Sequence, residues 1–215
     1  MKHLMKIFML FLISCFILLG IWQVNRMQWK NNLIDTAQTN SGLNPISSMP
    51  QNYEDSLLYR QVDFTAQLVK TKKLIMIPES YKQKFYYRVM APVKLNDKLV
   101  LVDFGLAQSK NIQLPDKIKT RAVIFNFDRM NIFYPSNNPE KLVWYNTDHQ
   151  TLKNYLGINI EPFYLKIVPG FGINENFVIK PFATSYRNDH LMYAITWFVL
   201  AFFCSIVFYF RVKTK

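Results

Sequence analysis

Two long apolar runs lie at the ends of the chain, and a mixed segment lies between them. The first run extends from Ile7 to Ile21, or to Val24 with its flank, and the second extends from Leu191 to Phe210. Neither run contains Asp, Glu, Lys or Arg. A helix needs about 20 apolar residues to cross the hydrocarbon core of a bilayer, and inside lipid only a helix satisfies the backbone of such a segment. The pattern therefore predicts a transmembrane helix over residues 7–24 and an interfacial segment with a second transmembrane helix over residues 187–210.

A cleaved signal peptide is the alternative for the first run, because such a peptide is also short and follows basic residues. Lys2 and Lys6 fit that alternative. No small-x-small cleavage site follows Gly20, however. Trp22 and Arg26 follow instead. An aromatic residue and then a charged residue are typical of the end of a transmembrane helix, where the chain leaves the membrane. The sequence favours a retained helix.

Short basic flanks predict the orientation of both helices. The tails, residues 1–6 and 211–215, carry Lys and Arg but no acidic residue. Both termini are therefore expected in the cytoplasm, with the middle segment on the other side of the membrane. Because the first run begins close to Met1, without a transit segment rich in Arg and Ser, a bacterial inner membrane is favoured over a mitochondrial inner membrane.

The middle of the chain changes from a helical to a β pattern. Trp22, Arg26 and Leu33 keep helical spacing, and a stretch rich in Ser, Pro and Asn follows, so residues 25–52 are expected to form a helical extension and a linker. Residues 53–186 contain short runs rich in Val, Ile, Phe and Tyr, separated by turn residues. The strands predicted from these runs cover residues 58–69, 73–78, 86–95, 98–104, 121–127, 143–145, 163–168 and 177–179.

One helix is predicted inside this domain. Thr147 or Asp148 can cap its start, Leu152 and Leu156 repeat at helical spacing, and Gly157 marks its end. The predicted fold class is therefore a membrane protein of the α+β type, in which N- and C-terminal transmembrane helices flank one antiparallel β-rich extracytoplasmic domain.

Charge and cysteine content limit what this domain can do. Residues 25–190 carry 21 of the Lys and Arg residues and all 14 Asp and Glu residues. This excess of positive charge suits an acidic partner or anionic lipid head groups, or it reflects a composition rich in Lys, Asn and Ile. A nucleic-acid partner is not expected, because no binding motif occurs. Cys15 and Cys204 lie inside the apolar runs, so the domain has no disulfide, thiolate metal site or cysteine nucleophile.

Catalytic motifs are missing from the sequence. GxSxG, HExxH, a P-loop and a Cys/His cluster are all absent, and Asp and Glu occur singly, without an acid/base pair. We therefore do not expect an enzyme. An exported enzyme or sensor domain is an alternative class, and turnover by the detached domain would support the enzyme.

Side chains that could bind a ligand lie where the two helices are expected to leave the membrane on the same side. The topology brings together Trp22, Arg26, Arg187, His190, Tyr193 and Trp197. Imidazole is a common axial ligand of haem iron, guanidinium groups pair with carboxylates such as haem propionates, and aromatic rings can pack on the macrocycle. Each of these residue types can also be explained without a ligand. Trp and Tyr belong at membrane interfaces, Arg at the end of a span reaches head groups, and a His at a helix start can be a polar cap.

The residues around this interface resemble the Surfeit locus protein 1 family of cytochrome c oxidase assembly factors. One matching block runs from Gly20 to Ile34 (GIWQVNRMQWKNNLI). The other runs from Arg187 to Ala201 (RNDHLMYAITWFVLA), and from Asn188 it carries the family's Asn-x-His-Leu-x-Tyr-Ala-x-Thr-Trp signature. A third match is Tyr59-Arg60-x-Val62. The order of the blocks extends the resemblance over nearly the whole chain.

The resemblance implies a function. The protein would assist the insertion of haem a into oxidase subunit one, with His190 as the ligand of the haem iron and Trp22 nearby. The implied cofactor is haem a, bound transiently, and the implied partners are oxidase subunit one and haem a synthase-type proteins, besides the lipid bilayer. A cofactor-free scaffold that stabilises the oxidase subunit is the alternative.

The middle of the chain departs from the family at five positions. Gln61 stands where the family has Pro, and Ala66 stands where it has Gly. The family's Asn-Arg-Gly-Trp stretch reads Asp103-Phe104-Gly105-Leu106, which keeps only the glycine. Any partner contact that the family's Arg or Trp makes is in question at Phe104 and Leu106.

Overall fold

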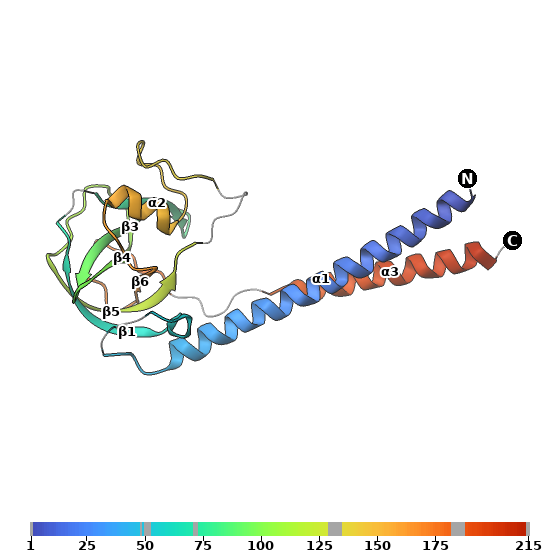
Figure 1. Ribbon diagram of the computed structural model, residues 1–215, viewed down its shortest axis with the longest axis horizontal. Coiled ribbons are helices and arrows are strands. Elements are labelled where there is room, and N and C mark those ends of the chain that lie inside the picture. Colours follow the sequence, from blue (N-terminus) through green and yellow to red (C-terminus); the bar gives the residue numbers. More distant parts are fainter. Residues whose placement is uncertain are drawn as a thin grey trace. The chain divides into compact units, whose positions relative to one another are not determined.

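The chain forms two compact units in the structure, which is a computed structural model that describes residues 2–47, 49, 53–70, 73–128, 135–181 and 188–213 (Figure 1). The first, called here the helical unit, consists of Met1–Thr36 and Thr184–Lys215. The second, called the barrel unit, is Ala37–Ala183.

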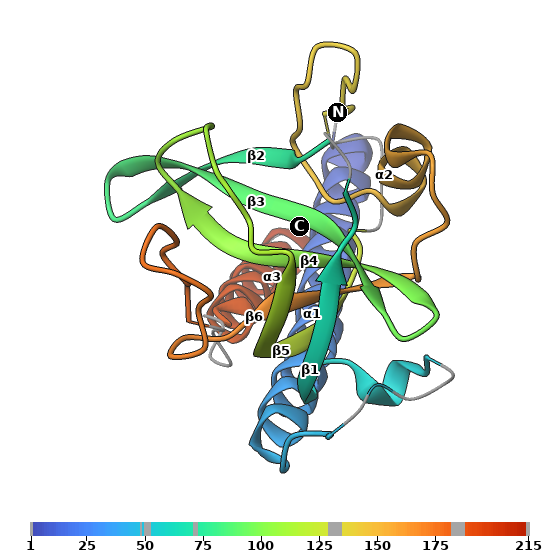
Figure 2. The same ribbon diagram turned by 90° about the vertical axis from the view of Figure 1, so that its left-hand side faces the viewer.

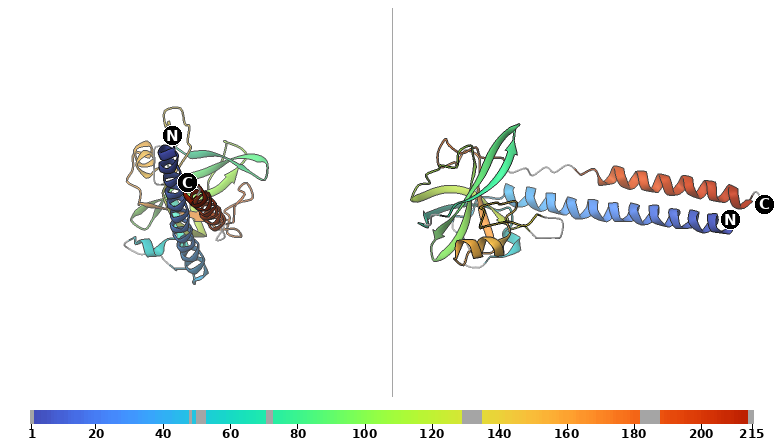
Figure 3. Two further views of the ribbon diagram at one scale, coloured as in Figure 1. Left: turned by 90° about the vertical axis from the view of Figure 1, so that its right-hand side faces the viewer. Right: turned by 90° about the horizontal axis from the view of Figure 1, so that it is seen from above.

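Two helices make up the helical unit. They are α1 (Lys2–Gly42), whose last residues belong to the barrel unit, and α3 (His190–Lys213). The two helices lie side by side and antiparallel (Figure 3). The helix predicted as far as Leu33 continues to Gly42, because no Pro or Gly interrupts the chain after Gly20. Part of the predicted linker is therefore helical.

Small residues lie at the contact between α1 and α3. Gly20, Ala194 and Ala201 are buried, and a Cβ added to Gly20 would lie 2.5 Å from Cε1 of Phe198. Small residues at helix contacts allow close approach of membrane helices, which lack a hydrophobic driving force for association. These three small residues therefore allow α1 and α3 to approach each other closely.

The outward faces of both helices are apolar and exposed. Phe11, Leu18 and Phe202 each expose more than half of their surface. Both helices are long and apolar enough to cross a membrane. An exposed apolar surface of this extent needs a cover, and it is compatible with a membrane protein.

Six strands form the sheet of the barrel unit (Figure 2). They are β1 (Gln61–Leu68), β2 (Ile75–Tyr81), β3 (Lys84–Leu95), β4 (Lys98–Ala107), β5 (Lys117–Asn126) and β6 (Phe163–Ile167), and a short 3₁₀ helix, η1 (Asp55–Leu57), precedes β1. The order is β1-β5-β6-β4-β3-β2, and β1 also pairs with β3. This last pairing closes the sheet into a barrel, with β2 as an added strand on β3.

The barrel differs from the prediction in one pairing, in two short strands and in the bounds of several strands, such as β5, which begins at Lys117 instead of Arg121. β4 and β6 are parallel, whereas the other neighbours are antiparallel. The segment between β4 and β6, residues 108–162, includes β5 and is long enough to carry the chain back to the start of β4, as a parallel pair requires. The strands predicted at 143–145 and 177–179 are isolated bridges instead, from Val143 to Asn138 and from Val178 to Leu106.

Two hydrophobic cores lie on opposite faces of the sheet. The barrel interior holds residues from every strand of the ring, such as Val62, Val102 and Leu165. The outer face of β2, β3, β4 and β6 carries a second core under α2 (His149–Leu156), in which Trp144 is almost fully buried. β4 is buried on both faces for this reason, and it reads as a nearly continuous apolar run.

The helix α2 is where the capping pattern predicted it. The Asp148 carboxylate accepts a hydrogen bond of 2.9 Å from the Thr151 amide, and Gly157 ends the helix with φ 70°. Leu152 and Leu156 are buried on the face toward the sheet. The prediction of this helix and of its two caps is confirmed.

Candidate functional site

His190 begins α3 and contacts α1 through its imidazole ring. Its Nδ1 lies 2.7 Å from the Gln23 side-chain oxygen. His190 and Gln23 are both half-buried. The contact joins residues from the two segments that the sequence predicted to lie next to each other.

A second polar contact lies next to this one. The Asn188 side-chain nitrogen donates to the Asn31 side-chain oxygen at 2.8 Å and to the Met27 carbonyl at 3.3 Å. Gln23, Met27 and Asn31 follow one another at i+4 spacing and therefore share one face of α1. The start of α3 is thus attached to a single face of α1 at two points.

The predicted aromatic residues have different surroundings. Trp197 stacks on Phe16 of α1, with ring centroids 5.7 Å apart and an angle of 24° between the rings. It lies seven residues after His190, or about 10 Å along the helix. Trp22 and Tyr193 expose 56% and 58% of their surface, so both rings are available to a ligand or to lipid.

The two predicted arginines also differ. The Arg26 guanidinium lies over the Trp29 ring, 3.9 Å from its centroid, in a cation–π contact. This contact holds an exposed positive charge one turn from Gln23. Arg187 lies outside the described residues.

The donor set fits a haem better than a bare metal ion. Among the described residues, no group of three or more His, Cys, Asp and Glu side chains could hold a metal ion. A haem iron needs fewer protein ligands, because the macrocycle supplies the equatorial nitrogens. His190 could supply an axial nitrogen, Arg26 could pair with a propionate, and the exposed rings of Trp22 and Tyr193 could cover the macrocycle.

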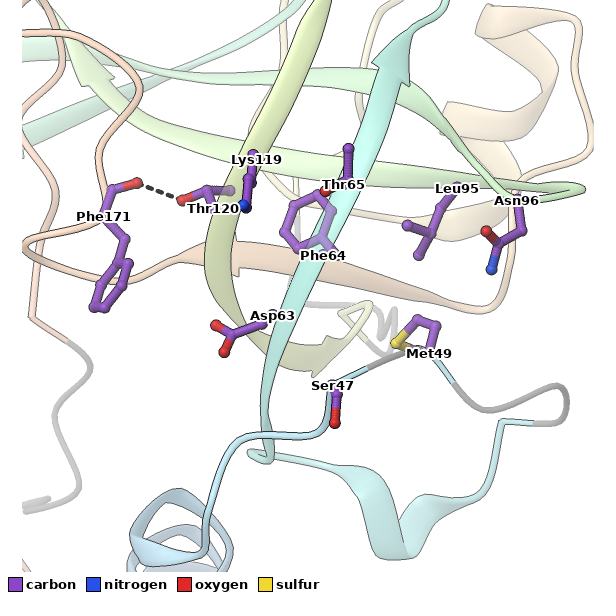
Figure 4. Close-up of a pocket in the computed structure, with 10 residues that line it drawn as sticks. All are labelled: Ser47, Met49, Asp63, Phe64, Thr65, Leu95, Asn96, Lys119, Thr120 and Phe171. Atoms are coloured by element: carbon purple, nitrogen blue, oxygen red, sulfur yellow. Dashed lines mark hydrogen bonds between the residues drawn. The ribbon is translucent and has the colours of Figure 1, made fainter.

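The barrel unit has its own cavity of about 610 Å³ on the side of β1 (Figure 4). Its lining includes Phe64, Thr65, Leu95 and Lys119. The one carboxylate in the lining, Asp63, forms a bidentate ion pair with Arg121, at 2.6 and 2.8 Å. This pair lowers the pKa of Asp63 below its usual range, mainly through the hydrogen bonds from Arg121. The cavity thus has no acid/base pair in its lining.

A buried carboxylate lies elsewhere in the barrel unit. Asp103 is 1% exposed and accepts a hydrogen bond of 2.9 Å from the Gly105 amide. Burial raises the pKa of Asp103, although the positive charges of Arg88 and Lys166 oppose the rise. Arg88 in turn donates to Glu79 at 2.9 Å. These charges form a structural network on the outer face of the sheet.

Most of the residues at which the chain departs from the family pattern are buried and contribute to packing. Phe104, Leu106 and Ala66 are all buried, so apolar side chains suit these positions. Gly105 has φ 101°, and a Cβ there would lie 2.6 Å from Cδ1 of Ile179, which explains why glycine is kept. Gln61 donates to the Ser41 carbonyl at 3.0 Å, as a Pro could not.

The comparisons with known proteins cover most of the chain. The model of the SURF1 family matches residues 10–202. A SURF1-like protein of Rickettsia prowazekii is 29% identical and aligns with 95% of this chain and 88% of its own length. A SURF1-like protein of Dictyostelium discoideum is 26% identical, with 98% and 96% covered. Human Surfeit locus protein 1 is 26% identical, with 85% and 69% covered.

The family match includes both blocks that carry the resemblance and the whole barrel unit between them. It also includes His190, Gln23 and the contact face of α1. A match over residues 10–202 spans far more than half of the chain. The chain therefore belongs to the SURF1 family.

Proposed function

We propose that this protein assists the insertion of haem a into subunit one of a cytochrome c oxidase, by binding the haem transiently at His190. Haem a is cargo in this proposal and supplies no chemistry to the protein. The observation that supports it is a single imidazole that contacts Gln23 where two apolar helices meet, with the exposed rings of Trp22 and Tyr193 and the guanidinium of Arg26 within three residues of Gln23 or His190 along the chain. Oxidase subunit one and haem a synthase-type proteins are the proposed partners.

The proposed setting is a bacterial inner membrane. α1 and α3 would both span it, with both termini in the cytoplasm, because the short tails are basic. The barrel unit would then lie on the opposite side. With one axial ligand at a wet interface, the haem would be held weakly enough to be released, and the protein would act without catalysing a reaction.

The test is an absorption spectrum of the full chain, purified in detergent from cells that make haem a. We expect a haem signal from the wild type and its loss in His190→Ala, with the barrel unit still folded. His3→Ala is the matched control, since His3 is an exposed histidine near the other end of α1, and it should keep the signal. A colourless wild type, or an unchanged signal in His190→Ala, would refute the proposal.

A cofactor-free scaffold is the second candidate. The contact of α1 with α3 would then only shape a surface for the oxidase subunit, and His190 would be a polar cap. Haem-free protein that restores oxidase assembly equally well with His190→Ala would support this candidate.

A further inference from the structure

We infer that Gln23 is a positioning residue, which holds the His190 ring in the tautomer that leaves Nε2 unprotonated and able to bind iron. The contact between the two side chains, at 2.7 Å, carries this inference. Its haem-binding consequence rests on the proposed function above, whereas the tautomer itself does not.

The chemistry of the two partners determines where the proton lies. An amide oxygen only accepts hydrogen bonds, so the Nδ1 that faces it carries the hydrogen. In a neutral imidazole the other nitrogen, Nε2, then holds the lone pair. A metal binds an imidazole only through such a nitrogen, and a hydrogen bond to the opposite nitrogen commonly fixes the ring in metal sites.

The surrounding contacts hold the ring in place. Asn188, two residues before His190, is bound to Met27 and Asn31, which lie one and two turns beyond Gln23 on the same face of α1. The backbone before His190 is therefore attached to the same helix face that presents the Gln23 amide. A half-buried hydrogen bond is also stronger than one in water, because the local dielectric is lower.

An amide at this position has a different effect from a carboxylate. A carboxylate that accepts from a ligating histidine raises the basicity of the ring and strengthens its bond to the metal. Gln23 orients the ring in the same way but adds no charge. This combination suits a protein that must present a ligand and still release its cargo.

The first experiment measures the tautomer without haem. The full chain, labelled with ¹⁵N in its histidines and held in lipid nanodiscs, gives a two-bond ¹H–¹⁵N pattern that differs between the two neutral forms. The His190 signals are assigned by comparison with His190→Ala. We expect the Nδ1–H form in the wild type and a mixture of both forms in Gln23→Leu.

Two further variants test the specificity of the effect. Gln23→Glu should keep the Nδ1–H form, because a carboxylate also accepts from Nδ1. Gln28→Leu is the matched control, since Gln28 is an exposed glutamine on the same helix, and it should leave the His190 pattern unchanged. A wild-type ring in the Nε2–H form, or a pattern that Gln23→Leu does not alter, would overturn the inference.

A haem titration of the same variants separates this inference from the proposed function. With haemin as the probe, we expect the apparent affinity to fall about tenfold in Gln23→Leu, as for other outer-shell partners of metal ligands, and to rise in Gln23→Glu. If the wild type has the Nδ1–H form but takes up no haem, the proposed function fails and the positioning by Gln23 stands. If haem binds but the tautomer is not fixed, the positioning fails and the function stands.

Discussion

Asp103 carries a buried carboxylate in the barrel unit. Its carboxylate is buried beneath the outer face of the sheet, with one backbone hydrogen bond and two positive side chains near it. A buried charge is costly unless it is paired, and burial raises the pKa of Asp103 although the charges of Arg88 and Lys166 oppose the rise.

The raised pKa of Asp103 makes barrel stability depend on pH. Above about pH 4, where an unfolded Asp ionises, the folded state holds the proton of Asp103 longer than the unfolded state does. Wild-type stability should therefore fall as pH rises, relative to Asp103→Asn, which has no proton to lose. Urea unfolding of both chains in detergent from pH 4 to pH 7 measures this difference.

Asp97→Asn is the control for this pH series. Asp97 lies exposed in the turn between β3 and β4, so Asp97→Asn measures the effect of the same substitution at a surface position. A constant difference in stability between wild type and Asp103→Asn across the series would contradict the prediction.

At the scale of elements, α2 depends on its N-cap. Asp148→Ala removes the carboxylate that accepts from the Thr151 amide, and we expect a loss of about 1 kcal/mol in the free energy of unfolding. The loss should appear in urea unfolding because α2 covers the outer core. Gln150→Ala, in the same helix but exposed, should change stability little. Equal effects of both changes would argue against capping.

The contact of α1 with α3 depends on Gly20. In Gly20→Leu the new side chain meets Phe198, whose Cε1 would lie 2.5 Å from the added Cβ, and we expect overpacking to cost about 1–3 kcal/mol. Unfolding of the helical unit by SDS measures the loss. Gly42→Ala is the control, because nothing lies within 4 Å of a Cβ at that position. A Gly20→Leu chain as stable as Gly42→Ala would show that the helices do not pack here.

The elements that were predicted correctly from the sequence are those whose ends or extent are determined by residues nearby in the chain. Asp148 and Gly157 mark both ends of α2, and the uninterrupted apolar runs mark the two long helices. The residues 143–145 and 177–179 have strand-forming side chains, but each pairs at a single position. Whether a short run becomes a strand depends on neighbours distant in sequence, and strand order depends on them as well.

The candidate site was predictable only in part for the same reason. The sequence indicated that His190 and the end of the first span come together, because topology alone requires it. It did not single out Gln23 as the partner of His190, since that depends on the register of two antiparallel helices. The i+4 spacing of Gln23, Met27 and Asn31 was the available signal, and it becomes meaningful only once α3 is placed on that face.

At the scale of the whole molecule, the candidate site lies in the helical unit and not in the barrel unit. The helical unit carries His190 and its contact with Gln23, whereas the described part of the barrel unit has a hydrophobic interior and no group of side chains that could hold a metal ion. Substitutions in the barrel interior should therefore act through folding. Substitutions on the contact face of α1 and α3 should act on the site directly.

The position of β6 also determines when the barrel can form during synthesis. β6 is the last strand in the chain, yet it lies between β4 and β5 and pairs with both. Until residues 163–167 have emerged, both of those strands have an open edge, and open edges invite pairing with other chains. The nascent protein therefore cannot complete its barrel until shortly before α3 is made. The unfinished sheet has to be protected from pairing with other chains until that moment, so a stall of synthesis just before β6 is more hazardous than an early one.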